Sequence, residues 1–288
     1  MPPRSDKWNA FTGTLIPAKG DTMSGRLRHL AIVSDRPPLL SEFYRTLFGM
    51  NGEPPKPGGA AVFSDGYIGF NVNPRAPGRQ GGFDHFGFEV DAVDDVRAEL
   101  SESYPTIQLA QRPGGRPFAG ISTHDPVGNV FDLSQRDMAN RRDVYVDDVR
   151  DQPRYVDHVV LRVVETDRIA RYYMDLFDLQ EMEKAPSDRN TYLTDGRVTF
   201  VIAPWDIHDY DGGGIERPAL EHIGFKVDSV DAVLSDLEAM MRDNPELSPK
   251  PWKEGPEGAV RLRKLAECPR GQYQLCDPDG VLIDLTEA

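Results

Sequence analysis

The strongest constraint in this sequence is an internal repeat, because the second half of the chain restates the first in the same order. The central copies are residues 84–91, DHFGFEVD, and residues 221–228, EHIGFKVD. Four more blocks pair in that order: 28–33 with 157–162, 42–48 with 171–177, 63–68 with 193–198, and 125–134 with 277–286. Matched blocks of this kind are typical of a duplicated structural unit. The sequence therefore predicts two equivalent halves.

The apolar residues of the central copies alternate, which indicates half-buried strands. In the first copy Phe86, Phe88 and Val90 share one face, and His85 and Gly87 share the other. The second copy repeats this arrangement, so its histidine also lies on the face opposite the apolar one. A histidine placed there is a candidate metal ligand or base.

The remaining pattern predicts an α+β fold. Apolar positions of helical period occur at 39–48 and at 230–241. Turns are predicted by Asp-Gly at 65–66 and 195–196 and by Asp-Pro-x-Gly at 125–128 and 277–280. Each half then contains two units of one strand, one helix and three strands. The whole chain is predicted to hold four βαβββ modules.

Composition and charge limit the setting in which the chain works. The chain of 288 residues carries a formal net charge of -14, which argues against nucleic acid and anionic membranes as partners. No run of about 18 apolar residues occurs, and residues 1–25 hold no apolar stretch of the secretory kind. Cys268 and Cys276 are read as free thiols, which fits a reducing cytoplasm. We expect a cytoplasmic protein.

The same features suggest where the chain divides. Residues 1–25 are predicted to be a flexible arm, and the charged stretch 137–154 lacks apolar periodicity, as expected of a linker. This leaves an N-terminal domain at 26–136 and a C-terminal domain at 155–288.

Four of the six histidines occupy matched places in the repeat, together with one aspartate in each final strand. The first set is His29, His85 and Asp132, and the second set is His158, His222 and Asp284. Strand alternation puts each set on the side of its strands away from the helix. Two neutral imidazoles and one carboxylate suit a divalent transition metal and leave positions for substrate. The alternative is that the histidines hydrogen-bond within the sheet and the aspartates cap turns.

These motifs strongly resemble the vicinal oxygen chelate superfamily. The resemblance rests on FY…LFG at 43–49, HFGFEVD, HIGFKVD and the DPVGNVFDL run at 125–133, and it covers residues 27–287. The superfamily includes glyoxalase I, extradiol ring-cleaving dioxygenases, methylmalonyl-CoA epimerase and fosfomycin- and bleomycin-resistance proteins. The resemblance implies two domains, each a curved mixed sheet that forms a cup with helices outside.

The four-module layout looks most like type I extradiol dioxygenases, in which the C-terminal domain holds the metal. This implies His158, His222 and Asp284 as ligands, with His29, His85 and Asp132 at the same places in the first half. It also implies one divalent metal per active domain, Fe(II) first, with Mn(II) or Zn(II) as the other candidates.

The sequence departs from that family in two ways. Both carboxylates are aspartate where the family usually has glutamate. Where the family has an acid–base histidine and a tyrosine, this chain has Arg197 or Val198, and Gln274. His208, in the loop 203–219, is therefore the candidate catalytic residue, because it could swing toward the metal.

This resemblance implies a metal-dependent oxidoreductase, an extradiol-type dioxygenase that acts with O2 on a small aromatic or vicinally oxygenated molecule. A glyoxalase- or epimerase-like lyase or isomerase stays open as an alternative. So does a metal-free, resistance-type protein that binds a small molecule. The substrate is small, neither nucleic acid nor membrane is expected as a partner, and a homo-oligomer is left open.

Overall fold

The computed structural model describes residues 24–52, 55, 58–136, 138, 145, 152–213, 217–250, 259, 263 and 271–288. Most of the proposed arm at 1–25, most of the proposed linker at 137–154, and Cys268 lie outside these residues. The elements of the first half are β1 (Gly25–Ser34), α1 (Pro37–Phe48), β2 (Asn51–Gly52), β3 (Ala61–Ser64), β4 (Gly69–Pro74), β5 (Gly82–Val90), α2 (Val93–Ser103), β6 (Ala110–Gln111), β7 (Ile121–His124) and β8 (Val130–Gln135). Those of the second half are β9 (Tyr155–Val163), α3 (Thr166–Phe177), β10 (Gln180–Glu181), β11 (Thr191–Thr194), β12 (Thr199–Pro204), α4 (Ile207–Gly213), β13 (Ala219–Val227), α5 (Val230–Asp243), the 3-10 helix η2 (Pro245–Leu247), β14 (Tyr273–Cys276) and β15 (Leu282–Glu287).

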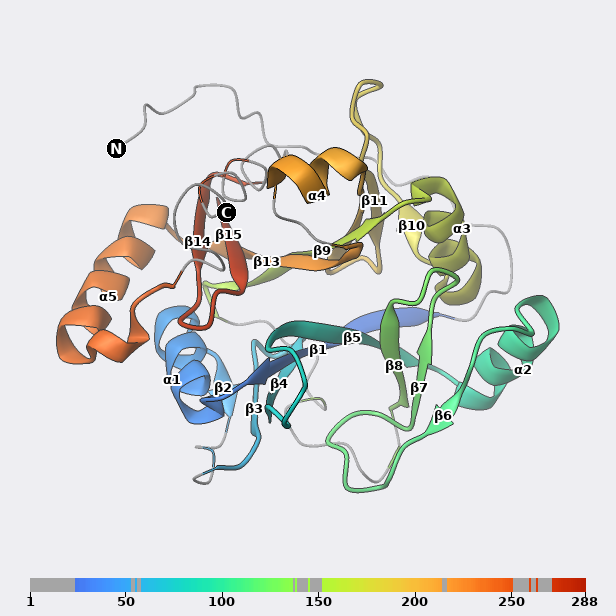
Figure 1. The fold of residues 1–288 in the computed structure, drawn as a ribbon, viewed down its shortest axis with the longest axis horizontal. Helices are drawn as coiled ribbons and strands as arrows, with labels where there is room; N and C mark the ends of the chain where they lie inside the picture. Colours follow the sequence, from blue (N-terminus) through green and yellow to red (C-terminus); the bar gives the residue numbers. More distant parts are fainter. Residues whose placement is uncertain are drawn as a thin grey trace.

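Each half forms one mixed sheet (Figure 1). The strand order is β2-β3-β4-β1-β5-β8-β7-β6 in the first sheet and β10-β11-β12-β9-β13-β15-β14 in the second. In both, an antiparallel pair lies at the centre, β1 with β5 and β9 with β13, and each central strand has a parallel neighbour on its other side. The predicted α+β class and the repeat are confirmed.

The predicted turns lie where the sequence placed them. The two Asp-Gly pairs join β3 to β4 and β11 to β12, and Gly66 and Gly196 have positive φ of 89° and 86°, which glycine adopts without strain. The four modules follow in order, although only β14 and β15 follow α5 in the fourth module within the described residues.

The segment 203–219, which was predicted to be a loop, holds the helix α4. The helix begins with a reciprocal cap. The Asp206 carboxylate accepts from the backbone N–H of His208, and the Asp209 carboxylate accepts from the N–H of Asp206. This arrangement satisfies N–H groups that a helix start leaves without partners. The Asp-x-x-Asp spacing was therefore the missed helix signal.

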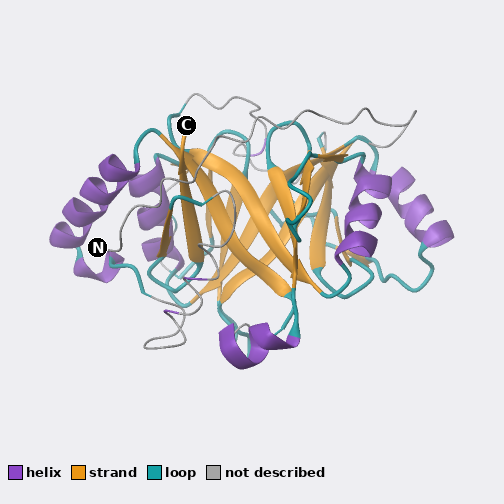
Figure 2. Cartoon of the chain, turned by 90° about the horizontal axis from the view of Figure 1, so that it is seen from above, coloured by secondary structure: helices purple, strands orange, loops and turns teal. Residues whose placement is uncertain are grey.

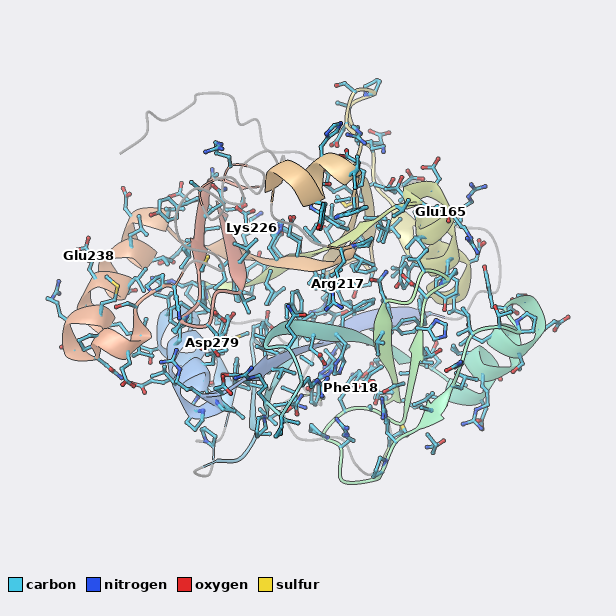
Figure 3. All side chains as sticks on the ribbon, in the orientation of Figure 1. Phe118, Glu165, Arg217, Lys226, Glu238 and Asp279 are labelled. Carbon is cyan, nitrogen blue, oxygen red and sulfur yellow. The ribbon has the colours of Figure 1, made fainter. Side chains whose placement is uncertain are left out.

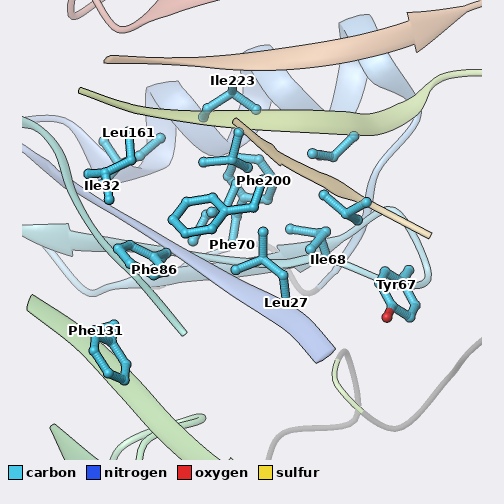
Figure 4. Close-up of a cluster of buried hydrophobic side chains, with 14 of the residues drawn as sticks. Leu27, Ile32, Tyr67, Ile68, Phe70, Phe86, Phe131, Leu161, Phe200 and Ile223 are labelled. Atoms are coloured by element: carbon cyan, nitrogen blue, oxygen red, sulfur yellow. The ribbon is translucent and has the colours of Figure 1, made fainter. Parts of the chain in front are cut away.

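The apolar faces of the two sheets meet in one hydrophobic core. Figure 4 shows Leu161, Phe200 and Ile223 of the second sheet close to Phe70 and Ile32 of the first, and all of them belong to one cluster of buried residues. Seen from above, the strands occupy the middle of the molecule and helices lie at both flanks (Figure 2). The concave faces, which carry the histidines, therefore point away from each other.

Aromatic stacking across the core repeats with the same symmetry as the sequence. Phe48 of α1 stacks on Phe225 of β13 with ring centroids 3.8 Å apart, and Phe177 of α3 stacks on Phe88 of β5 at 4.1 Å. One aromatic ring from the first helix of each half thus stacks on a ring from the sheet of the other half. Burying such rings is worth several kcal/mol each, so the two halves stabilise each other.

Hydrogen bonds cross between the halves in matched pairs. The Tyr44 hydroxyl donates to the Asp277 carboxylate at 3.0 Å, and the Tyr173 hydroxyl donates to Asp125 at 3.1 Å. Both aspartates begin an Asp-Pro-x-Gly turn, so each turn is tied to the first helix of the opposite half. Among the helices that the structure describes, none has the length and apolar character that crossing a bilayer needs.

Candidate metal centre

The structure brings the C-terminal set of ligands together. His158 lies on β9, His222 on β13 and Asp284 on β15, and one ligand atom of each lies within 4.8 Å of the others. Gly224 is the Cα partner of both His158 and Asp284. A Cβ at Gly224 would come within 2.0 Å of the His158 ring, so the glycine leaves the room in which these side chains converge.

The C-terminal set fits a metal because its converging atoms lack other partners. His158 Nε2, His222 Nε2 and Asp284 Oδ2 are buried, and none has a hydrogen-bond partner among the described residues. His158 Nε2 lies 3.3 Å from Asp284 Oδ2. Buried polar atoms are nearly always satisfied. A divalent ion would accept a lone pair from each of these three atoms and so satisfy them together.

The other ring nitrogen of each C-terminal histidine is held by an acid. His158 Nδ1 lies 2.9 Å from an Asp157 oxygen, and His222 Nδ1 lies 3.2 Å from a Glu221 oxygen. The register between β9 and β13 shifts at both Asp157 and Glu221. These bulges break the strict alternation, so each acid can reach the histidine that follows it. Partners of this kind fix the imidazole orientation and leave Nε2 for a metal.

Charge in this site favours a neutral His222 beside an ionised Glu221. Burial lowers the pKa of His222, which keeps the imidazole in its metal-ligating form. Burial alone would raise the pKa of Glu221, but the Arg162 guanidinium and His222 hold it well below its usual range. Arg162 Nε donates to Glu221 at 2.7 Å. The series of contacts from Arg162 to Glu221 to His222 therefore fixes the orientation of the His222 imidazole.

Replacing Glu221 by glutamine should weaken metal binding by about 10–100-fold, the usual cost of losing an outer partner of a metal ligand. The amide keeps the shape of the side chain but removes the charge that orients His222. Titration of the apoprotein with Fe(II) or Mn(II) measures the change. Glu238→Gln, on the exposed face of α5 (Figure 3), is the matched control and should bind like the wild type. Equal affinities for both variants would show that Glu221 does not support the site.

The structure also brings the N-terminal set together. His29 lies on β1, His85 on β5 and Asp132 on β8, around Gly87, with ligand atoms again within 4.8 Å. His85 Nε2 lies 3.2 Å from Asp132 Oδ2, and its Nδ1 lies 2.6 Å from Asp84. Burial opposes a charge on His85, but the hydrogen bonds with Asp132 and Asp84 together raise its pKa to about 9. Burial lowers the pKa of His29 to about 3.

His29 differs from the other three histidines in its outer partner. The bulged residue before it is Arg28 rather than an acid, and His29 Nδ1 instead pairs with the Tyr145 hydroxyl at 2.7 Å. Phe118 stacks on the His29 ring with centroids 4.7 Å apart. The N-terminal cup is therefore occupied by aromatic side chains of the chain itself.

The positions expected for acid–base chemistry need correction. Val198 lies in the shared core and the Arg197 guanidinium packs over the Tyr67 ring, so neither lies on the metal side. The residue beside His158 on β12 is Thr199. Gln274 does lie at the site, and its amide donates to Asp284 Oδ1 at 3.0 Å.

His208 stays a prediction. It lies on α4 with an exposed side chain, whereas the three C-terminal candidate ligands are fully buried. Sequence reasoning also passed over the acids that hold Nδ1. Their signal was present, because Asp84, Asp157 and Glu221 each directly precede a repeat histidine.

The metal side of the C-terminal sheet continues into an apolar wall. Val160 follows His158 by two residues and clusters with Val201, Ala203 and Tyr192, with Met182 against them. This buried apolar wall borders the candidate ligands on the concave face of the sheet.

A separate cleft of about 530 Å³ lies between the two halves, in the region of Arg217 (Figure 3). Its lining includes Asp84 and Glu221, the outer partners of His85 and His222. None of the six candidate ligand residues is among the residues that line it. The cleft is thus lined by the two acids that contact the Nδ1 atoms of these histidines.

Fold and site together define a protein of paired βαβββ modules with two clusters of two histidines and one carboxylate. The model of the Glyoxalase/Bleomycin resistance protein/Dioxygenase superfamily matches residues 155–285, which confirms the resemblance seen in the sequence. No curated protein sequence matches the chain.

Solved structures with the same fold cover nearly the whole chain. The Mn(II)-bound glyoxalase from Novosphingobium aromaticivorans is 17% identical, with a TM-score of 0.59 over 91% of this chain and 81% of that one. The 2,3-dioxygenase LapB from Pseudomonas sp. KL28 is 15% identical, with a TM-score of 0.59 over 93% and 94%. Homoprotocatechuate 2,3-dioxygenase from Arthrobacter globiformis is 15% identical, with a TM-score of 0.60 over 93% and 80%. At these identities the likeness establishes the fold.

Proposed function

We propose that this chain is a metal-dependent oxidoreductase of the extradiol dioxygenase type, with its active site at His158, His222 and Asp284. The observation that carries the proposal is the set of three buried, unpartnered donor atoms that converge on the concave face of the second sheet. Fe(II) is the proposed ion, with Mn(II) or Zn(II) as the other candidates, because two imidazoles and one carboxylate suit such metals. A bound ion would supply Lewis acidity toward two adjacent oxygens of a substrate.

The chain's own residues define what the site can bind. The wall of Val160, Val201 and Ala203 offers an apolar surface beside the ligands, which fits a small aromatic body. Thr199, Tyr192 and Gln274 lie on or near this side and can hydrogen-bond substrate oxygens. Full burial of the ligands keeps bulk water away, which strengthens every charge interaction there.

Oxygen uptake tests the proposal. Protein loaded anaerobically with Fe(II) and then given a panel of catechols in air should consume oxygen in equimolar amount with catechol. A ring-cleavage product should appear at the same rate. Metal-free protein is the control and should do neither. Absence of uptake with every catechol tested would remove the dioxygenase assignment.

A glyoxalase- or epimerase-like activity is the second candidate, because a Mn(II)-bound glyoxalase shares the fold. Turnover of a 2-oxoaldehyde–thiol adduct without oxygen would assign it. A protein that binds small aromatics in the absence of metal, with metal analysis negative, would instead be a binding protein of the resistance type.

A further inference from the structure

The N-terminal cluster of His29, His85 and Asp132 has the same residue types in the same arrangement as the C-terminal cluster, but its surroundings differ. His85 Nδ1 pairs with Asp84, and His29 Nδ1 pairs with the Tyr145 hydroxyl. Both histidines therefore present Nε2 toward Asp132. Outer partners on Nδ1 are typical of metal-ligating histidines.

Within the cluster, the two histidines lie at different distances from the carboxylate. His85 Nε2 lies 3.2 Å from Asp132 Oδ2, but His29 Nε2 faces the same oxygen at 4.0 Å, which is too far for a hydrogen bond. A hydrogen bond between His85 and Asp132 thus serves two of the three groups. A divalent ion would accept a lone pair from all three.

The carboxylate of this cluster is held in place from its other side. The Ser122 hydroxyl donates to Asp132 Oδ1, and Arg112 Nε donates to the same hydroxyl at 2.6 Å. An anchored carboxylate with one oxygen turned toward two imidazoles is a preorganised ligand.

The cup around this cluster is closed by the chain itself. Phe118 stacks on His29, and Tyr145 packs against both rings. Arg28, which stands where the other histidines have an acid, donates to the backbone carbonyl of Tyr145 at 2.8 Å and so keeps it in place. Phe118 lies on the side of its sheet away from the second half (Figure 3).

Glycines make the room for this cover. A Cβ at Gly69 would come within 2.0 Å of Tyr145, and one at Gly87 would come within 2.7 Å of Phe118. Gly69 is the neighbour of His29 in the sheet, at the place that Thr199 takes beside His158 in the second half. The space that a substrate would need in the N-terminal cup is therefore filled by side chains of the chain itself.

We propose that His29, His85 and Asp132 form a second divalent-metal site, which holds an ion such as Zn2+. Phe118 and Tyr145 cover this site and close it to substrate. Such a site is structural rather than catalytic, because Phe118 and Tyr145 occupy the space beside His29 that a substrate would need, and a bound ion contributes to folding. The assignment does not depend on what the C-terminal site catalyses.

Zinc stoichiometry of the full-length chain tests the second site. Apoprotein incubated with Zn2+ and passed through a desalting column should retain two ions in the wild type, and one each in His85→Ala and His222→Ala. Asp132→Asn keeps the side-chain shape and should lose the same ion as His85→Ala, which guards against misfolding of the alanine variant. Wild-type zinc content in folded Asp132→Asn would overturn the proposal. Loss of zinc in His222→Ala alone would support only the C-terminal site.

The cover is tested in the His222→Ala background, where only the N-terminal ion remains. Phe118→Ala should speed zinc release to EDTA by about 10-fold or more, because the shell around a metal controls solvent access. Tyr192→Ala, an aromatic truncation in the other cup, is the matched control and should leave the rate unchanged. Zinc should also raise the Tm of the His222→Ala protein but not of the His222→Ala, Asp132→Asn protein. Equal release rates for Phe118→Ala and Tyr192→Ala would overturn the closed character of the site.

Discussion

Replacing His222 by alanine is expected to remove the metal from the C-terminal half and to lower catechol-dependent oxygen uptake by at least about 100-fold, since losing a ligand costs more than losing its outer partner. The physical reason is that His222 Nε2 is buried and has no hydrogen-bond partner among the described residues, as is also true of His158 Nε2 and Asp284 Oδ2. Asp284 and His158 cannot compensate, because their positions are fixed by the register of β15 and β9 against β13. Metal analysis and an oxygen electrode measure both effects on one sample.

Two further variants sharpen that experiment. His124→Ala removes a histidine outside both clusters, whose Nδ1 lies 2.8 Å from a backbone carbonyl, and it should keep its metal and its turnover. His208→Ala tests the candidate acid–base residue on α4. Retained metal with a reduced kcat would support that role, and unchanged turnover would remove it. Oxygen uptake by His222→Ala at the wild-type rate would contradict the C-terminal active site itself.

Replacing Phe225 by alanine is expected to lower the free energy of unfolding by about 3–5 kcal/mol, the usual cost of deleting a buried aromatic ring. Phe225 is fully buried and stacks on Phe48 across the boundary between the halves. Because both sheets share one core, the whole chain should unfold in a single transition at a lower denaturant concentration. Equilibrium denaturation followed by circular dichroism and by tryptophan fluorescence measures it.

The repeat provides the controls. Phe88→Ala removes the equivalent ring, which stacks on Phe177, and should cost a similar amount. Val164→Ala, whose side chain is 60% exposed, should change the stability by less than about 0.5 kcal/mol. Two separate transitions, with only one of them shifted by Phe225→Ala, would show that the halves are stable independently.

Because strand alternation is a local property, the sequence could predict that the two histidines and one aspartate of each half share a face. Once His85 and Phe86 are known to lie on a strand, their faces are fixed by period two. Strand alternation could not predict that Glu221 and Asp157 contact the neighbouring histidines, since a β-bulge interrupts the alternation at each of these residues. It also could not tell which residue of β12 lies beside His158, because Thr199 pairs with His158 through sheet register rather than through chain spacing.

By itself, the sequence determined the repeat, the βαβββ modules and the two sets of two histidines and one aspartate, because each follows from pattern along the chain. Only the tertiary structure decided that the two sets are unlike. In the second half the converging atoms are left without partners beside an apolar wall. In the first half, Phe118 and Tyr145 fill the cup around His29. Tyr145 lies 116 residues beyond His29, so no local pattern could reveal that contact.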